Sequence, residues 1–159
     1  MHLFGWLLET LYAVGTLGYF TKRGFLYGPL CPIYGWGAII LISVLHKHKS
    51  NPPKLFFYSA IVFSVFEYIV GFALDALFAD KWWDYTNDFM NLNGRISIFY
   101  SFAWGIIALI FINYIHPFIE KAIHKALKKI PNLWQLVIIR CGLSIIVVDT
   151  ILSCIKYLI

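Results

Sequence analysis

The stretch Leu55–Phe78 reads LFFYSAIVFSVFEYIVGFALDALF and contains only two charged side chains, Glu67 and Asp75. About 20 mostly apolar residues suffice for a helix to cross the hydrocarbon core of a bilayer, so the stretch predicts a membrane-spanning helix. The whole chain has the same bias, since 60% of its 159 residues are hydrophobic and 13% are charged. Soluble globular chains have about 45–50% apolar and about 25% charged residues. The composition therefore argues strongly against a water-soluble domain, a disordered chain and a nucleic-acid-binding module.

Five segments of the chain are long and apolar enough to span a membrane, and we expect an all-α bundle that forms one integral membrane domain over residues 1–159. The segments are Leu3–Phe20, Tyr27–Leu45, Leu55–Phe78, Ile96–Ile115 and Leu133–Tyr157. Prolines and glycines crowd the start of the second segment, which predicts a broken or re-entrant first turn. The loop before it, residues 24–32, is expected to form a fixed turn that dips toward Glu67.

A short amphipathic stretch lies between the fourth and fifth segments. Apolar residues recur at helical spacing between Pro117 and Pro131, with four lysines elsewhere on the helical wheel. The pattern predicts an interfacial helix over residues 116–132, which Pro117 starts and Pro131 ends. The fifth helix is then expected over residues 133–158. A docking site for a cytoplasmic partner is the alternative interpretation of the amphipathic stretch.

The distribution of lysine and arginine predicts the orientation of the chain in the membrane. If five helices alternate, the loops on the side of the N-terminus hold seven of these residues and the opposite loops hold four. The seven are Lys47, Lys49, Lys54, Lys121, Lys125, Lys128 and Lys129, and the four are Lys22, Arg23, Lys81 and Arg95. We therefore expect a multi-pass protein of the cell membrane with a cytoplasmic N-terminus.

The sequence also contains a candidate internal repeat. Gly24 and Gly94 lie 70 positions apart. Further pairs at this offset are Leu26 with Ile96, Tyr34 with Trp104, Gly35 with Gly105, and Ile39-Ile40 with Leu109-Ile110. In the preceding segments Glu9 and Glu67 correspond at an offset of 58, so the second half would hold about 12 extra residues in its outer loop. Because apolar helices resemble one another by composition, duplication and coincidence both remain open. The predicted repeats are residues 3–45 and 55–115.

Ionisable side chains inside a bilayer cost at least about 2.5–3.5 kcal/mol on insertion scales, so each needs a partner, water or a function. The predicted spans hold five of them: Glu9, Glu67, Asp75, Arg140 and Asp149. Glu9 and Arg140 lie at similar depth, which predicts a structural ion pair between the first and fifth helices. Glu67, Asp75 and Asp149 are then left without a basic partner in the membrane. Together with Glu9 they predict either an acidic pocket or relay for a cation or polar solute, or a hydrogen-bond network that stabilises the bundle.

The outer loop that follows Phe78 is dense in aromatic and polar residues. Its candidate site residues are Trp83, Asp84, Tyr85, Asn93 and Arg95. Tryptophan and tyrosine are enriched at membrane–water interfaces, which accounts for the rings. The polar residues predict a lid over the outer mouth of the bundle, in which Asp84 and Arg95 pair with each other or grip a ligand.

Motifs for other chemistry are absent from the sequence. It contains no Walker loop, HExxH motif, dinucleotide-binding fingerprint or nucleophile elbow, so it holds no ATPase site of its own. Cys31, Cys141 and Cys154 lack metal-ligand spacing, and His46 and His48 lie in a basic loop, so we expect no metal site. No cofactor is indicated, and the lack of a catalytic motif favours a protein that is not an enzyme.

Several loop motifs of the chain are familiar as a set. They are Gly24–Pro29, Pro32, Tyr34-Gly35, Glu67, Trp83–Tyr85 and Asn93-Gly94. These motifs resemble a family of small bacterial multi-pass proteins, the CmpB-like or ABC-transporter type IV family, over roughly residues 4–115. The resemblance implies a permease-like role and a separately encoded ATP-binding subunit as partner.

The sequence fits three kinds of function. The first is a small transporter or permease subunit, alone or as a homo-oligomer, with an acidic intramembrane pocket and two outer loops as its gate. The second is a membrane enzyme or lipid-binding protein whose Asp84 and Arg95 engage a headgroup at the outer interface. The third is an accessory subunit of a larger membrane complex. A cavity beside Glu67 favours the first, whereas a packed and dry surrounding contradicts transport through a pocket at that residue.

Overall fold

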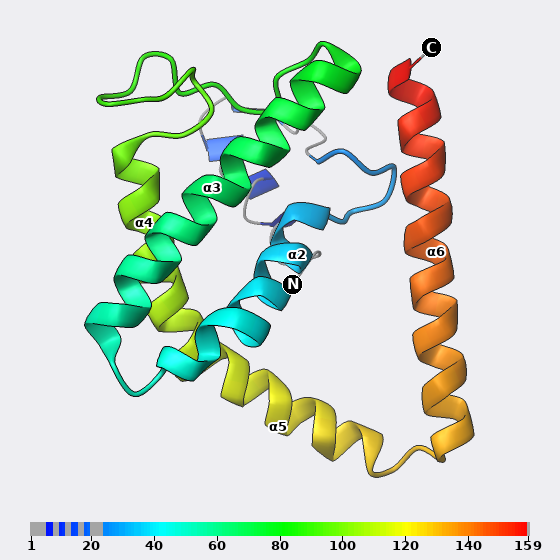
Figure 1. Ribbon diagram of the computed structural model, residues 1–159. Helices are drawn as coiled ribbons and strands as arrows, with labels where there is room; N and C mark the ends of the chain where they lie inside the picture. The colour runs from blue at the N-terminus through cyan, green and yellow to red at the C-terminus, as the bar shows by residue number, and fades with distance from the viewer. Residues whose placement is uncertain (1–5, 8–9, 12–13, 16–17, 20–23, 159) are drawn as a thin grey trace. The chain divides into compact units, whose positions relative to one another are not determined.

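The computed structural model describes residues 6–7, 10–11, 14–15, 18–19 and 24–158. Its contacts divide the chain into two units. One unit comprises Met1–Ala38 together with Ile123–Ile159, and the other is Ile39–Ala122. The described residues form α-helices joined by turns and loops, as the composition predicts (Figure 1). Among them, the one β-type pairing outside the helices is an isolated bridge between Leu92 and Ile96.

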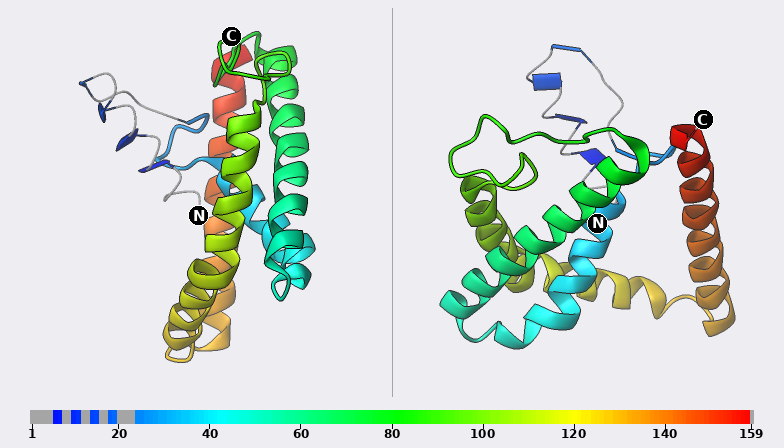
Figure 2. Two further views of the ribbon diagram at one scale, coloured as in Figure 1. Left: turned by 90° about the vertical axis from the view of Figure 1, so that its left-hand side faces the viewer. Right: turned by 45° about the horizontal axis from the view of Figure 1, so that its top comes forward.

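The Ile39–Ala122 unit is built around a hairpin of two helices, α3 (Pro52–Phe78) and α4 (Ile98–Ile110), joined by loop 79–97 (Figures 1 and 2). The buried residues of α3 recur at every fourth position along one face: Leu55, Ser59, Phe63 and Glu67. On α4 the buried residues are the small Gly105 and Ala108. Small residues at a helix contact let two backbones approach closely, which explains why α3 and α4 pack along their length.

The remaining surface of α3 is apolar as well, although it is exposed. Its large exposed residues Phe57, Ile61, Val65, Ile69 and Phe72 have relative exposures of 54–64%. A helix that is apolar on all sides belongs in a protein core or a bilayer. Since these side chains stay more than half exposed among the described residues, they form a surface suited to lipid.

Both ends of α3 carry recognisable caps. The Asn51 side chain accepts a hydrogen bond from the backbone N–H of Lys54 at 3.2 Å, and Pro52 occupies the first turn, where its missing N–H costs nothing. At the other end Ala79 adopts the left-handed conformation (φ 52°) and donates its N–H to the carbonyl of Asp75. These caps place the start of loop 79–97 directly after Phe78.

The second predicted span, Tyr27–Leu45, is helical only from Pro32 onward. It forms α2 (Pro32–Ile40), a π-helix η1 (Leu41–Leu45) and a 3₁₀ turn η2 (His46–His48). Residues 27–31 are not helical, which confirms the predicted irregular start. Proline is tolerated at the first helical position because its fixed φ suits a helix and its missing N–H has no partner there.

The fourth predicted span does not end at Ile115. From α4 the chain passes through a π-helix, η3 (Phe111–Ile115), directly into α5 (His116–Leu127). The N–H of His116 donates to the carbonyl of Phe111, the wide spacing of a π-helix, immediately before Pro117, which has no N–H to donate. The amphipathic helix expected over residues 116–132 is thus a continuation of α4, and it ends at Leu127 rather than at Pro131.

The last helix, α6 (Asn132–Leu158), coincides with the predicted fifth span. Its start is fixed by Gln135, whose side-chain amide donates to the carbonyls of Leu127 at 3.0 Å and Ile130 at 2.8 Å. These two bonds connect the start of α6 to the turn after α5, where the Leu127 carbonyl also accepts from the N–H of Ile130 at 3.0 Å.

Three helices in the described part are long and apolar enough to cross a membrane: Pro52–Phe78, Ile98–Leu127 and Asn132–Leu158. A helix of 27 residues is about 40 Å long, which exceeds the hydrocarbon core of about 30 Å. The expectation of five spans is therefore corrected to three for the described residues. The helical part of the second segment is too short, and most of the first segment, Leu3–Phe20, lies outside the described residues. The protein is a multi-pass membrane protein, while the side on which its N-terminus lies stays a prediction.

The close contact of α3 with α4 can be tested at Gly105. A β-carbon at Gly105 would lie 2.6 Å from two ring carbons of Phe56, a ring that packs edge-on against Phe102 at 5.0 Å. Gly105→Ala is therefore expected to lower the free energy of unfolding by about 1–3 kcal/mol, the usual cost of overpacking a core. Thermal unfolding of the purified protein in detergent measures the change.

Gly142→Ala on α6 is the matched control. No atom lies within 4 Å of the β-carbon that this substitution adds. Alanine in place of a helical glycine is then expected to leave stability unchanged or raise it by up to about 1 kcal/mol. Equal losses from the two substitutions would contradict the packing of Gly105 against α3.

Candidate functional site

Glu67 is the last residue of the buried face of α3 and is only 5% exposed. The indole Nε1–H of Trp104 on α4 donates to its Oε2 at 3.0 Å, and the hydroxyl of Tyr85 in loop 79–97 donates to its Oε1 at 3.0 Å. A buried carboxylate is costly unless its oxygens are hydrogen-bonded. Glu67 meets this requirement with one donor from the partner helix and one from the loop.

Aromatic stacking holds both donors in place. The Trp104 ring stacks on Phe63 of α3 with 5.1 Å between centroids, and the Tyr85 ring stacks on Tyr100 of α4 at 4.2 Å. Because each ring is packed against a helix, the donor group at its edge has little freedom to turn away from Glu67. The carboxylate therefore joins α3, α4 and the loop at one point.

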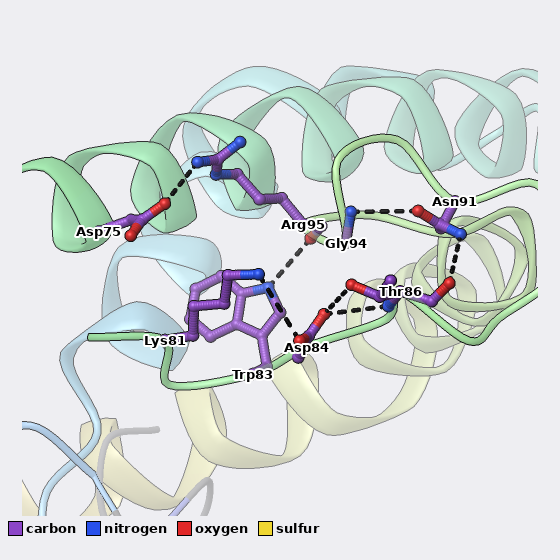
Figure 3. Close-up of polar contacts among 8 residues, drawn as sticks. All are labelled: Asp75, Lys81, Trp83, Asp84, Thr86, Asn91, Gly94 and Arg95. Carbon is purple, nitrogen blue, oxygen red and sulfur yellow. Dashed lines mark hydrogen bonds and ion pairs between the residues drawn. The ribbon is translucent and has the colours of Figure 1, made fainter. Parts of the chain in front are cut away.

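A second carboxylate of α3, Asp75, holds the far end of the loop. One oxygen of Asp75 lies 2.6 Å from Nη2 of Arg95 (Figure 3). The guanidinium also lies over the rings of Tyr68 at 5.7 Å and Phe72 at 5.5 Å. The indole of Trp83 donates to the carbonyl of Arg95 at 2.9 Å. A charged hydrogen bond combined with cation–π contacts is among the stronger polar arrangements available at a partly buried position.

Loop 79–97 has further contacts with α3. The side-chain amide of Asn93 donates to the hydroxyl of Tyr68 at 3.0 Å. Trp83 and Arg95 also lie against Gly71, where a β-carbon would come within 3.1 Å of the Trp83 ring. The sequence predicts that Gly71 admits a partner helix, but in the structure it is the loop that occupies this space.

The loop is also braced by bonds within itself. Asp84 accepts hydrogen bonds from both the hydroxyl and the backbone N–H of Thr86, and it lies 3.6 Å from the ammonium of Lys81 (Figure 3). The Thr86 hydroxyl and N–H, with a smaller contribution from Lys81, hold the pKa of Asp84 below its ordinary value. Asn91 accepts from the N–H of Gly94, which has a φ of 68° that favours glycine.

Asp149 likewise binds a loop, in the unit that Met1–Ala38 and Ile123–Ile159 form together. Its two oxygens accept hydrogen bonds from the backbone N–H groups of Tyr27 and Gly28, both at 2.9 Å. One turn along α6, the hydroxyl oxygen of Ser153 also accepts from the N–H of Tyr27 at 3.1 Å. Lys156 extends the contact, since its ammonium lies over the Tyr27 ring at 5.1 Å. The first loop is therefore bound to α6 within this unit.

A small cavity lies beside the loop in the Ile39–Ala122 unit. Its volume is about 10 Å³, and its lining residues are Gly71, Leu74, Lys81, Trp82, Trp83 and Arg95. This is about the space of one water molecule. Glu67 does not line this cavity, and the predicted acidic pocket stays a prediction.

Two of the predicted pairings need correction. Arg95 pairs with Asp75, not with Asp84, so Asp75 does have a basic partner. Asp84 instead pairs with Lys81. The physical reason is burial, because an arginine that is partly removed from water gains most from the carboxylate that shares its environment. Within its own unit the first loop binds Asp149 through the N–H groups of Tyr27 and Gly28, and its dip toward Glu67, a residue of the other unit, stays a prediction.

The predicted pair of Glu9 with Arg140 stays a prediction. Glu9 lies outside the described residues. Arg140 lies on an exposed part of α6, and no hydrogen bond or ion pair links it to another residue of the described part. The described residues likewise contain no group of three or more potential metal ligands.

Two groups that engage these acids are not predicted from the sequence, one at Glu67 and one, in the other unit, at Asp149. Trp104 was matched only to Tyr34 in the repeat, although an indole N–H in the middle of an apolar helix signals a need for an acceptor. Ser153 lies four positions after Asp149 and thus on the same face of α6, a spacing that the sequence does display. The backbone donors of Tyr27 and Gly28 leave no signal in the sequence.

Fold and site together define a helical multi-pass membrane protein in which carboxylates of the membrane helices hold the connecting loops. The model of the family described as “Putative ABC-transporter type IV” (CmpB) matches residues 1–154. The chain belongs to this family, which confirms the resemblance of the loop motifs. Neither the curated proteins nor the solved structures contain a significant match to the chain.

The bonds of Glu67 predict a specific cost for losing one donor. Trp104→Phe keeps the ring against Phe63 but leaves one oxygen of a buried carboxylate without a partner. We expect the free energy of unfolding to fall by about 1–3 kcal/mol, measured by thermal unfolding in detergent. Trp134→Phe on α6, where the ring is 60% exposed, is the control and should leave stability nearly unchanged. If neither substitution changes the free energy of unfolding, the hydrogen bond from Trp104 to Glu67 does not stabilise the fold.

The bonds of Asp84 predict a pH dependence of the loop. Because its lowered pKa favours the charged form in the folded loop, the stabilisation is fully present above the unfolded pKa of about 3.9 and is lost as the pH falls through the folded pKa. We expect hydrogen exchange at the Thr86 amide, corrected for its intrinsic pH dependence, to lose protection in that acidic range. Asp84→Asn should remove the pH dependence, and Asp88→Asn, in the same loop, should keep it.

Proposed function

We propose that the protein is the membrane subunit of a transporter of the ABC class and that loop 79–97 is its outer gate. The observation that carries the proposal is the hydrogen bond from Tyr85 to Glu67, since a loop side chain reaches a carboxylate buried between two helices. In this proposal Glu67 anchors the closed gate and is not itself the binding site of the solute.

The contacts of the gate are suited to opening. The polar contacts of the loop with the helices are made by single side chains: Tyr85 with Glu67, Arg95 with Asp75, and Asn93 with Tyr68. The rings of Trp83 and Tyr85 add packing contacts on the surface of α3 and α4. The packing of α3 on α4 rests on other residues, the buried apolar and small side chains of the two helices. The loop contacts can therefore break without separating the helices, as a gate requires.

A second outer element supports the same proposal. Residues 27–28 are bound to Asp149 of α6 through backbone N–H groups. Two acids of the Ile39–Ala122 unit and one of the other unit are thus engaged by loops. Binding of a solute at Glu67, Asp75 or Asp149 would need the loop of the same unit to release that carboxylate first.

The energy source is proposed to be a separate ATP-binding subunit. The chain belongs to a family described as ABC-transporter type IV, and its sequence holds no phosphate-binding loop. A headgroup-binding function for Asp84 and Arg95 is less well supported, because Lys81 and Thr86 engage the first and Asp75 engages the second.

The gate can be tested with a cysteine at Ser97, which is 1% exposed at the end of the loop. In a background in which the three native cysteines are replaced by serine or alanine, Ser97→Cys should react slowly with a membrane-impermeant maleimide. Adding Asp75→Asn removes the negative charge that pairs with Arg95, and adding Tyr85→Phe removes a hydrogen bond to a charged group. Either loss is worth about 1.5–3 kcal/mol, so the labelling rate should rise by about tenfold or more.

Asn87→Cys, on the exposed part of the loop, is the control for this experiment, because its labelling rate should be the same in every background. Unchanged labelling of Ser97→Cys in the Asp75→Asn and Tyr85→Phe variants would refute the gate.

The partner is tested by purification from the native host in mild detergent. We expect an ATP-binding subunit to co-purify in stoichiometric amounts, and native mass spectrometry to detect an ion or polar solute. A retained lipid or isoprenoid without such a subunit would favour the lipid-binding alternative. Stoichiometric partners that include no ATPase would favour an accessory role.

A further inference from the structure

Segments that are distant in the sequence meet at one end of the Ile39–Ala122 unit. The ring of His46, in η2, lies 5.7 Å between centroids from the ring of His116, the first residue of α5. The ring of His48, also in η2, packs against Tyr58 of α3 at 4.8 Å. All four residues belong to this unit. The turn before α3 and the start of α5 therefore share the end of the unit that lies opposite loop 79–97 along α3 (Figures 1 and 2).

Residues 46–54 and 116–121 form this end of the unit, the basic end, which carries four exposed lysines. They are Lys47, Lys49, Lys54 and Lys121. The basic end contains one acid, Glu120, and in the described part of the chain none of the four lysines forms an ion pair with a carboxylate. In loop 79–97, by contrast, both Lys81 and Arg95 lie against a carboxylate. The basic end therefore has more positive charge than its own acid balances.

Exposed aromatic rings adjoin the lysines of the basic end. They are Phe57 and Tyr58 on α3, Tyr114 in η3 and Phe118 on α5, with relative exposures of 46–74%. Beyond these rings α3 continues with exposed apolar side chains such as Ile61 and Val65. Aromatic rings with a polar edge are enriched where the hydrocarbon of a bilayer meets its headgroups. The lysines thus lie at the border of the lipid-facing surface, at the depth of the headgroups.

We propose that the basic end binds the headgroups of anionic phospholipids, with its four lysines donating to phosphate oxygens. An ammonium group has three donors and suits phosphate as a point charge, and its apolar stem packs along rings and lipid chains. An acidic protein would offer the same charge, but it would have to cover the exposed rings as well. A lipid leaflet accommodates the rings and the cations together. The proposal does not depend on a transport function.

Lipid binding to the purified protein tests the proposal directly. Native mass spectrometry in mild detergent compares phosphatidylglycerol with phosphatidylcholine of the same acyl chains. We expect phosphatidylglycerol to bind more tightly, and Lys49→Gln and Lys54→Gln each to weaken its binding by about fivefold, the usual contribution of one lysine near an anionic surface. Binding of phosphatidylcholine should not change. Lys49→Arg and Lys54→Arg keep the charge and should keep the preference.

Lys81→Gln is the matched control, because it removes the same charge from an exposed lysine at the other end of α3. It should leave the affinity for phosphatidylglycerol unchanged. Equal affinity of the native protein for the two lipids would overturn the proposal. An equal loss of affinity in Lys81→Gln and Lys49→Gln would also overturn it, since the preference would then follow net charge and not the basic end.

Two further outcomes identify a different occupant and would likewise overturn the proposal. Millimolar inorganic phosphate that displaces phosphatidylglycerol as effectively as the lipid itself would show a site for free phosphate. A protein that co-purifies from the native host, and is lost in Lys49→Gln with Lys54→Gln while the lipid preference stays, would show a protein-binding surface. Labelling of Ser97→Cys should be the same in these variants, so a failure of the lipid proposal is distinguishable from a failure of the gate.

Discussion

The structure depends on the requirement that a carboxylate removed from water be hydrogen-bonded. Glu67 sits at the end of the buried face of α3, where an unpaired acid would cost several kcal/mol. Its two oxygens are bonded by Trp104 of α4 and Tyr85 of loop 79–97. An apolar contact between the same helices would be stable without any loop. Burial of Glu67 couples the position of the loop to the packing of α3 on α4, because only a correctly placed loop supplies the second donor.

The same requirement is met differently at the two other acids. Asp75 lies nearer the end of α3 and binds a cation, Arg95, whose guanidinium also rests on two aromatic rings. Asp149 binds two backbone N–H groups, which is possible because residue 28 is a glycine: a β-carbon there would lie 2.9 Å from the carboxylate. In each case the donor comes from a connecting loop rather than from another spanning helix. Asp75 and Asp149 therefore act on the loops, whereas Glu67 joins a loop and the neighbouring helix α4.

The binding of these acids to groups in distant loops explains which features were predictable from the sequence. The helices α3 and α6 follow from long apolar segments, and the irregular start of the second segment follows from its prolines and glycines. The sequence also identifies the acids, since each interrupts an apolar run. It does not identify their partners, which lie up to 122 positions away and include backbone groups. The choice of Arg95 between Asp75 and Asp84 depends on which acid shares its partly buried position, and the number of spans depends on how much of the second segment is helical.

The occupied carboxylates also constrain any mechanism of transport. A carboxylate oxygen that accepts a hydrogen bond from a loop cannot be fully engaged by a solute at the same time. If Glu67 or Asp75 does bind a solute, that binding must compete with Tyr85 or Arg95, and by linkage a solute that binds them will favour the released loop. Opening of the loop and binding of the solute at these acids are then coupled equilibria. A solute that binds elsewhere would leave the loop contacts unchanged, so the response of the loop to solute reports directly on whether the acids take part.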